Sequence, residues 1–322
     1  VLDDPRLQII LQDGRNHLLT TQKKYDVITA DATHPWSADS WILYTKEMYR
    51  LVRSRLTDAG IFCQWVPLHW MSIDDFKCVL RTLRTEFPHL SLWYTGSYVV
   101  ALGSQKPITP DISDFAHRMQ QKSIQEDLAS VGIDSPASLL GLYLLANDGI
   151  DRFVGAGPLN TDDFAYLEHS ASRCFGRETT PENLAALMKV RQFPDFLLKG
   201  NRLDSRPGFE DDLRRLFHAR DKTMTGRIST YKGDFAGSVE YYKAALAQAP
   251  TDGVTKILLK DALSTLASAW ANNGDRARHA GKIKEAVSIY NQALKFDDNA
   301  PRAHNGLGLV YFARGDYGSA LR

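Results

Sequence analysis

The chain has 322 residues, of which 43% are hydrophobic and 24% charged, a composition that indicates an ordered globular protein with room for two or three domains. The 39 basic and 38 acidic residues leave a formal net charge of +1, so bulk charge does not select a nucleic acid or an anionic membrane as partner. Three cysteines, Cys63, Cys78 and Cys174, are too few and too scattered for a disulfide framework or a tetrahedral zinc site. We therefore expect no metal, and a reducing compartment.

The first part of the chain, residues 1–106, alternates short apolar runs with stretches of helical periodicity. This pattern predicts a mostly parallel sheet with crossover helices. The predicted strands are residues 7–11, 26–30, 60–65, 90–94 and 98–102, and the predicted helices are residues 40–56 and 74–87. The last two strands are joined through Thr95-Gly96-Ser97, and we expect them to form an antiparallel hairpin.

The second part, residues 107–205, is predicted to be helical and to contain no strand. The expected helices are residues 112–121, 124–131, 136–146 and 181–190. The apolar stretch 137–146 is about half the length that a bilayer crossing needs, which favours a buried helix. An irregular loop rich in Gly, Pro and Asp interrupts the helices at residues 155–164, and long loops of this kind often carry function.

The third part, residues 206–322, repeats a helical pattern. Gly281 and Ala286 recur as Gly315 and Ala320, a spacing of 34 residues, which is the period of tetratricopeptide repeats. An earlier copy begins at Gly233, 48 residues before Gly281, so we expect the middle repeat to carry an insertion of 14 residues near 272–280. Small residues in this pattern allow paired helices to approach closely, and an aromatic side chain fills the gap between repeats. A generic helical bundle is the alternative.

Four features of residues 3–104 resemble the C-terminal half of the spermidine synthase family, whose aminopropyltransferases have a Rossmann-like methyltransferase fold. They are Gln12-Asp13-Gly14-Arg15 after a predicted strand, Tyr25-Asp26-Val27-Ile28 leading to Asp31-Ala32-Thr33-His34-Pro35, the helix from Tyr44 to Tyr49, and Gly60-Ile61-Phe62-Cys63-Gln64 followed by Trp70. The loop that ends in Trp36 resembles bacterial members with membrane-spanning segments before this domain. The expected fold is a partial α/β Rossmann-like sheet followed by an all-α region that ends in repeats of the tetratricopeptide type.

The resemblance implies a donor site and a catalytic carboxylate. Asp13 and Gly14 would hold the adenine of decarboxylated S-adenosylmethionine, and Asp31 would accept or orient the proton of the attacking amine. An ammonium has no lone pair, so transfer to nitrogen requires deprotonation near the sulfonium. Each assignment has a structural alternative, because Asp13-Gly14 could be a simple turn and Asp31 could cap a helix or tie down its loop.

The acceptor side departs from the family's pattern at His34. Members that act on diamines usually carry a second aspartate at this position, and its loss argues against putrescine as the acceptor. Tryptophan rings near His34 could hold a cation by their faces instead. Asp162 and Asp163 could meet a polyamine's charge or a metal, or could belong to a helix cap. The candidate substrate-binding residues are His34, Trp36, Gln64, Trp70, Asp162 and Asp163.

These features predict a spermidine synthase-like transferase that uses an S-adenosyl-type donor and an amine acceptor, with repeats that bind a protein. Methyl transfer from S-adenosylmethionine, or an adaptor that has lost catalysis, are the alternatives. Both ends look cut, because the chain opens at Val1 without a methionine or signal-like segment and closes at Ala320-Leu321-Arg322 within an amphipathic pattern. The family's glycine-rich donor turn would precede residue 1, so we expect the chain alone not to turn over. Any membrane attachment, at the cytoplasmic side of an inner membrane, would come from segments outside this sequence.

Overall fold

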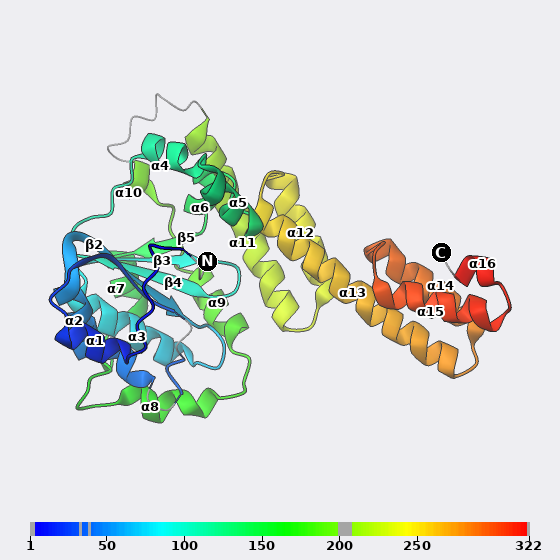
Figure 1. Ribbon diagram of the computed structural model, residues 1–322, viewed down its shortest axis with the longest axis horizontal. Helices are drawn as coiled ribbons and strands as arrows, with labels where there is room; N and C mark the ends of the chain where they lie inside the picture. The colour runs from blue at the N-terminus through cyan, green and yellow to red at the C-terminus, as the bar shows by residue number, and fades with distance from the viewer. Residues whose placement is uncertain (1–3, 32–33, 38–39, 199–207, 321–322) are drawn as a thin grey trace. The chain divides into compact units, whose positions relative to one another are not determined.

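The computed structural model describes residues 4–31, 34–37, 40–198 and 208–320. Contacts within the chain form two compact units, each described separately below (Figure 1). The sheet unit comprises Val1–Asp111 and Leu142–Arg202, and the helical unit comprises Ile112–Gly141 and Leu203–Arg322. The division into domains at residues 1–106, 107–205 and 206–322 stays a prediction, and its second boundary lies outside the described residues, as do Ala32 and Thr33 of the Asp31 loop.

The sheet unit is built on five strands in the order β1-β2-β4-β3-β5. They are β1 (Tyr25–Ala30), β2 (Leu56–Val66), β3 (His89–Tyr94), β4 (Val99–Ser104) and β5 (Tyr143–Ala146). Only β1 and β2 are parallel, whereas β4 is antiparallel to both of its neighbours and β5 is antiparallel to β3. The predicted β3–β4 hairpin is confirmed, but the prediction of a mostly parallel sheet is wrong, because β4 returns from that hairpin and pairs with β2.

Two other predictions from apolar runs are wrong. Residues 7–11 form no strand, because no described strand lies beside them, and Ile9 and Leu11 are 71% and 103% exposed. The predicted helix 136–146 ends early, as α6 (Pro136–Leu140), and is followed by β5. Tyr143, Leu144 and Leu145 are buried, and Tyr143 and Leu145 pair with β3. A short apolar run of this kind fits a buried strand as well as a buried helix.

Helices cover the sheet, and α3 (Ile73–Glu86) shows how the sequence forms them (Figure 1). Its first turn is closed by a capping box between Ser72 and Asp75. Phe76, Leu80 and Leu83 recur at helical spacing on its buried face. The remaining helices of this unit are α1 (Gly14–Thr20), η1 (Trp41–Tyr44), α2 (Lys46–Arg55), α7 (Asp148–Val154), α8 (Tyr166–Ser170), η2 (Ala171–Cys174), α9 (Thr180–Met188) and α10 (Asp195–Leu198).

The predicted helix 40–56 is two helices in the structure. Thr45 lies between η1 and α2 with extended backbone angles, and its hydroxyl accepts a hydrogen bond from the Met48 N–H. This side-chain cap starts α2 at Lys46 rather than at residue 40. The last turn of α2 leads directly into β2 at Leu56.

The helical unit contains the predicted repeat as consecutive helix pairs. Its helices are α4 (Ile112–Met119), α5 (Lys122–Ser130), α6, α11 (Phe209–Tyr231), α12 (Phe235–Gln248), α13 (Gly253–His279), α14 (Ile283–Phe296), α15 (Pro301–Ala313) and α16 (Tyr317–Ala320). Gly233, Gly281 and Gly315 end the first helix of each pair with φ near +80°, +75° and +76°, which glycine adopts readily. The 14 extra residues lengthen α13, which has 27 residues where α15, the first helix of the next pair, has 13.

No helix among the described residues is long and apolar enough to cross a membrane.

Candidate functional site

The carboxyl ends of β1 and β2 bring two predicted site residues to one edge of the sheet. Asp31 directly follows β1, and Gln64 near the end of β2 lies opposite Ala30 in the parallel register. Open α/β sheets bind their ligands at this edge. The Asp31 side chain is exposed, and no residue in the described ranges donates a hydrogen bond to it. Its carboxylate is therefore accessible to a ligand.

The charge of Asp31 acts on its neighbour Cys63. Burial raises the pKa of the Cys63 thiol, and the negative charge of Asp31 raises it further. The thiol is therefore protonated at neutral pH, and Cys63 is not an activated nucleophile.

Gln64 is fully buried, and its side chain is fixed by the strand ends. Its Nε2 donates to the carbonyl oxygens of Trp65 at 3.0 Å and of Ala30 at 3.4 Å. Its Oε1 is buried and has no partner among the described residues, and such an orphaned acceptor costs free energy unless a donor reaches it. These contacts fit the role of a strand-end hydrogen bond, and the free oxygen leaves one acceptor beside the Asp31 edge.

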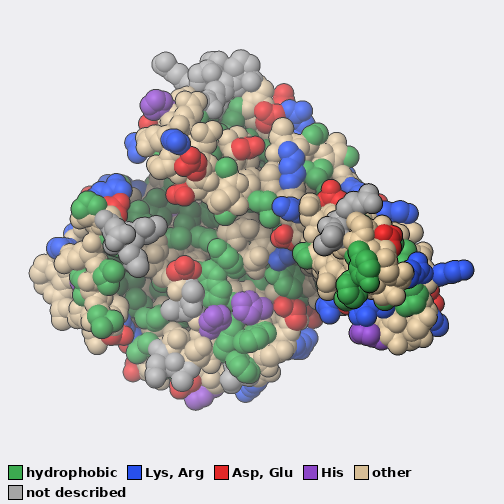
Figure 2. Space-filling model, turned by 45° about the vertical axis from the view of Figure 1, so that its right-hand side comes forward, with side chains coloured by type: hydrophobic (Ala, Val, Ile, Leu, Met, Phe, Trp, Pro, Cys, Tyr) green, Lys and Arg blue, Asp and Glu red, His purple; other side chains and the backbone are tan. Residues whose placement is uncertain are grey.

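Histidine and tryptophan side chains form a cluster at this edge, which we call the His/Trp cluster. It consists of His34, Trp36, Trp65, His69 and Trp70, all of them partly exposed. The ring centroid of His34 lies 4.8 Å from that of Trp36, 5.1 Å from that of Trp65 and 5.7 Å from that of His69. Figure 2 shows histidine side chains grouped with hydrophobic ones on one face of the molecule. The cluster thus offers a surface of ring faces and edges to a ligand.

The two histidines of the cluster are held in their neutral form. Burial lowers the pKa of His34. Burial also lowers the pKa of His69, the charge of His34 lowers it further, and the carboxylate of Glu178 partly opposes this. At neutral pH the rings therefore carry no positive charge that would repel an ammonium group. Glu178 adds a negative charge near the His69 side of the cluster.

A loop before α9 holds the far side of the cluster in place. The Trp70 N–H donates to the Arg177 carbonyl at 3.2 Å, and the Trp70 ring lies 4.9 Å from the ring of Phe175. Trp70 has φ of +55°, a left-handed conformation that is uncommon for a large side chain and is often found at functional sites. The backbone strain is balanced by these contacts, which fix the direction of the Trp70 ring.

The predicted donor residues lie at the start of α1. Asp13 is its N-cap, and one carboxylate oxygen accepts from the Asn16 N–H at 2.7 Å. A side chain added at Gly14 would meet no atom within 4 Å, so the space beside it is open. Both residues are exposed, which leaves the second oxygen of Asp13 able to accept from an exocyclic amine such as that of adenine. The residues therefore fit the adenine part of the donor while they also serve as a helix cap.

The Asn160–Asp163 loop is tied to the rest of the sheet unit. Asn160 is fully buried, and its side chain donates to the Trp41 carbonyl at 3.1 Å and accepts from the Leu167 N–H at 3.1 Å. Asp162 forms a two-point ion pair with Arg15 of α1, with Nη1 and Oδ1 3.0 Å apart. Burial alone would raise the pKa of Asp162, but the hydrogen bonds and charge of Arg15 hold it below the ordinary value. Asp162 is neutralised by this pair, and none of its described contacts is with the His/Trp cluster.

The described residues hold no group of three or more His, Cys, Asp or Glu side chains arranged for a metal ion. Asp163 is exposed beside the ion pair of Asp162, and it adds no such arrangement.

Two regions of the chain match known family models. Residues 1–99 match the model of the spermine/spermidine synthase domain. The chain carries a spermine/spermidine synthase-like domain. Residues 274–320 match the model of a TPR repeat, which agrees with the 34-residue spacing.

Curated relatives of the synthase-like domain are polyamine aminopropyltransferases. The protein from Synechococcus sp. (strain JA-2-3B'a(2-13)) is 30% identical over 151 residues, which are 44% of this chain and 48% of that protein. The protein from Korarchaeum cryptofilum is 33% identical over 85 residues, 26% of each chain, and the one from Bacillus subtilis is 29% identical over 123 residues, 35% of this chain and 44% of its own. The chain thus spans at most about half the length of these relatives. Neither methyl transfer nor a purely adaptor role is favoured by these matches.

Acidification should destabilise the synthase-like domain through its two cluster histidines. Their folded-state pKa values lie below the ordinary 6.5, so the unfolded chain binds protons first, and stability falls as the pH drops below 6.5 and is unaffected above it. Thermal unfolding at about pH 7.5 and about pH 5.5 measures this loss. The variant His34→Gln/His69→Gln should lose less stability over this interval than the parent, whereas His117→Gln in the helical unit should behave like the parent. Equal losses in all three proteins would contradict this prediction.

Proposed function

We propose that this chain takes part in aminopropyl transfer from decarboxylated S-adenosylmethionine to an amine, and that its helical repeats bind a protein partner. The observation that carries the proposal is the placement of Asp31 and the His/Trp cluster at the carboxyl ends of β1 and β2, within the region that matches the synthase domain. As part of the same proposal, residues 1–106 are the C-terminal half of a catalytic domain. The full-length protein would be attached to a membrane, with this domain on the cytoplasmic side.

The chemistry requires a base beside the reacting amine. The lone pair of the amine nitrogen attacks the carbon bonded to the sulfonium, the carbon–sulfur bond breaks, and its electron pair stays on sulfur as a neutral thioether. The nitrogen must lose a proton for this step, and in this proposal the exposed carboxylate of Asp31 accepts it. The same negative charge stabilises the sulfonium electrostatically before transfer. Asp13 and Gly14 would meet the adenine of the donor.

In this proposal the acceptor amine binds to the aromatic rings of the His/Trp cluster and to the carboxylates of Asp31 and Glu178 beside them. The tryptophan rings of the His/Trp cluster can hold an ammonium by cation–π attraction, which contributes about 0.5–2 kcal/mol. Asp31 lies at one strand end, and the charge of Glu178 reaches His69. The second aspartate that is usual in the family is replaced here by His34. In this proposal Glu178 supplies a negative charge in its place. Asp162 has no part in this binding, because Arg15 already neutralises it.

Calorimetry of the full-length protein with methylthioadenosine, with S-adenosylhomocysteine and with spermidine tests the proposal. We expect methylthioadenosine to bind more tightly than S-adenosylhomocysteine, and Asp31→Asn to weaken amine binding by about tenfold, since hydrogen bonds to charged groups contribute about 1.5–3 kcal/mol. Asp127→Asn is the matched control, because Asp127 is an exposed carboxylate of α5 that belongs to none of the candidate site residues.

Three results separate the possibilities. Preference for S-adenosylhomocysteine would favour methyl transfer instead. Binding of neither nucleoside would favour an adaptor. Equal amine affinities of the parent, Asp31→Asn and Asp127→Asn would show that Asp31 does not contribute to amine binding.

A further inference from the structure

The unusual length of α13 leaves part of its side uncovered. At 1.5 Å per residue, its 27 residues span about 40 Å, whereas the 14 residues of α14 span about 21 Å. α14 begins four residues after α13 ends and runs back along it, and the rings of Trp270 and Phe296 stack at 6.2 Å near the end of α14. α14 therefore stops about halfway along α13, and a groove opens where it stops.

This groove has an apolar floor and a basic rim. Its volume is about 520 Å³, and it is lined in part by Lys256, Leu259, Lys260, Leu263, Lys295 and Phe296. Leu259 and Leu263 are one turn apart on α13, and so are Lys256 and Lys260, so each pair forms a stripe along the helix. Lys295 comes from α14 on the other side. A ligand in the groove would meet leucine side chains below and ammonium groups beside it.

The three lysines are available for a partner's charges. None of them forms an ion pair with a carboxylate in the part of the chain that the structure describes, and all three are exposed. Asp297 and Asp298 lie at one end of the groove, where their carboxylates accept hydrogen bonds from the backbone and side chain of Asn299 at 3.0 and 2.8 Å. The rim is thus positive along the groove and negative at one end.

We propose that this groove binds an acidic amphipathic segment of a partner protein, with large apolar side chains on the leucine floor and carboxylates against the lysines. The chemistry selects a peptide because a concave groove does not fit the flat surface of a bilayer. Asp297 and Asp298 also interrupt the positive rim, which a segment with carboxylates only opposite the lysines can match and a continuous phosphate backbone cannot. The proposal rests on the protein-binding role proposed for the repeats, and it is independent of the transfer reaction.

A synthetic helical peptide of about 16 residues tests it, with leucines one turn apart on one face and glutamates beside them. Fluorescence anisotropy at about 50 mM and about 300 mM salt measures its affinity for the whole chain. Lys260→Glu should weaken binding by about tenfold at low salt and less at high salt. Lys284→Glu is the matched control, because Lys284 is an exposed lysine of α14 outside the groove, and it should bind like the parent. Leu259→Gln, which leaves the charges unchanged, should also weaken binding.

Several outcomes would contradict the proposal that this groove binds an acidic peptide. Equal affinity of the parent and both groove variants would place peptide binding elsewhere while the protein-binding role survives. Equal affinity for a peptide with lysine in place of glutamate would show that the groove lysines do not select acidic ligands. Binding of anionic vesicles or an oligonucleotide, but not the peptide, would identify another class of partner, and a dimer that Lys260→Glu dissociates would identify a second copy of the chain. No binding of any probe would remove both the groove and the protein-binding role. Far-UV circular dichroism verifies that each variant is folded.

Discussion

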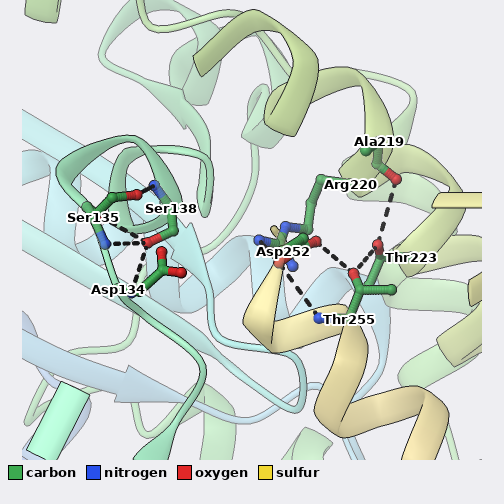
Figure 3. A network of polar contacts seen from close by, with 8 residues as sticks. All are labelled: Asp134, Ser135, Ser138, Ala219, Arg220, Thr223, Asp252 and Thr255. Atoms are coloured by element: carbon green, nitrogen blue, oxygen red, sulfur yellow. Dashed lines mark hydrogen bonds and ion pairs between the residues drawn. The ribbon is translucent and has the colours of Figure 1, made fainter. Parts of the chain in front are cut away.

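An Arg220→Met variant should lose about 3–5 kcal/mol of the unfolding free energy of the helical unit. Arg220 on α11 and Asp252 before α13 are both 1% exposed, and Nη2 of the arginine lies 3.1 Å from Oδ1 of the aspartate (Figure 3). Removal of the guanidinium leaves a carboxylate buried without its cation. The desolvation cost of that charge, rather than the strength of the pair itself, sets the size of the loss.

The polar network around the pair explains why the loss should affect the whole unit. Asp252 is the N-cap of α13 and accepts from the N–H and the hydroxyl of Thr255. The Thr255 hydroxyl lies 2.7 Å from that of Thr223 on α11, so the network joins the start of α13 to the middle of α11 (Figure 3). Loss of Arg220 therefore weakens both the helix contact and the cap.

Urea unfolding followed by circular dichroism measures the effect of Arg220→Met. Arg215→Met is the matched control, because its pair with Asp212 is 62% and 56% exposed and such pairs contribute about 0–1 kcal/mol. The variant Arg220→Met/Asp252→Asn removes both charges and should recover part of the stability. An Arg220→Met protein as stable as Arg215→Met would show that the buried carboxylate finds another cation or takes up a proton.

Local sequence signals were sufficient for most of the fold, and they failed where distant segments decide the structure. The helix Ile73–Glu86 and the hairpin of β3 and β4 follow from caps, periodicity and a turn, which are all local. β5 could not be recognised, because Tyr143, Leu144 and Leu145 become a strand only by pairing with β3, about 50 residues earlier. Residues 7–11 show the opposite case, since this apolar run has no neighbouring strand, forms no strand itself and stays exposed.

The part of the candidate site that follows β1 could be predicted, because one short sequence motif contains it. Asp31, His34 and Trp36 were identified because they follow a strand directly, as the resemblance required. Glu178 and Phe175 were missed, because they reach the cluster from a loop more than 100 residues later and no motif marks them. The pairing of Asp162 with Arg15, 147 residues apart, was missed for the same reason. The sequence was thus sufficient to predict Asp31 and Asp162 as candidate carboxylates, but it did not show that Asp162 is already paired with Arg15.

Replacing Tyr290 by alanine should destabilise the helical unit by about 3–5 kcal/mol, the usual cost of truncating a buried aromatic side chain. Tyr290 is fully buried, and a Cβ atom added at Gly274 or Gly306 would lie 2.6 or 2.2 Å from its ring. Its hydroxyl donates to Asp275 Oδ1 at 2.7 Å. The ring thus fills the space that two glycines leave between α13, α14 and α15, as the repeat pattern predicted. Tyr241→Ala on α12 is the control, because Tyr241 is 41% exposed.

Two further variants separate the contributions of the ring, the hydroxyl and the glycines. Tyr290→Phe should lose only the hydrogen bond to Asp275, about 1 kcal/mol. Gly306→Ala should cost about 1–3 kcal/mol by overpacking against the ring. Because the added methyl group and the ring compete for one space, Tyr290→Ala/Gly306→Ala should cost less than the sum of the single variants. Strictly additive losses in thermal unfolding would mean that ring and glycine do not share that space, and that the 34-residue pattern holds these helices together by other contacts.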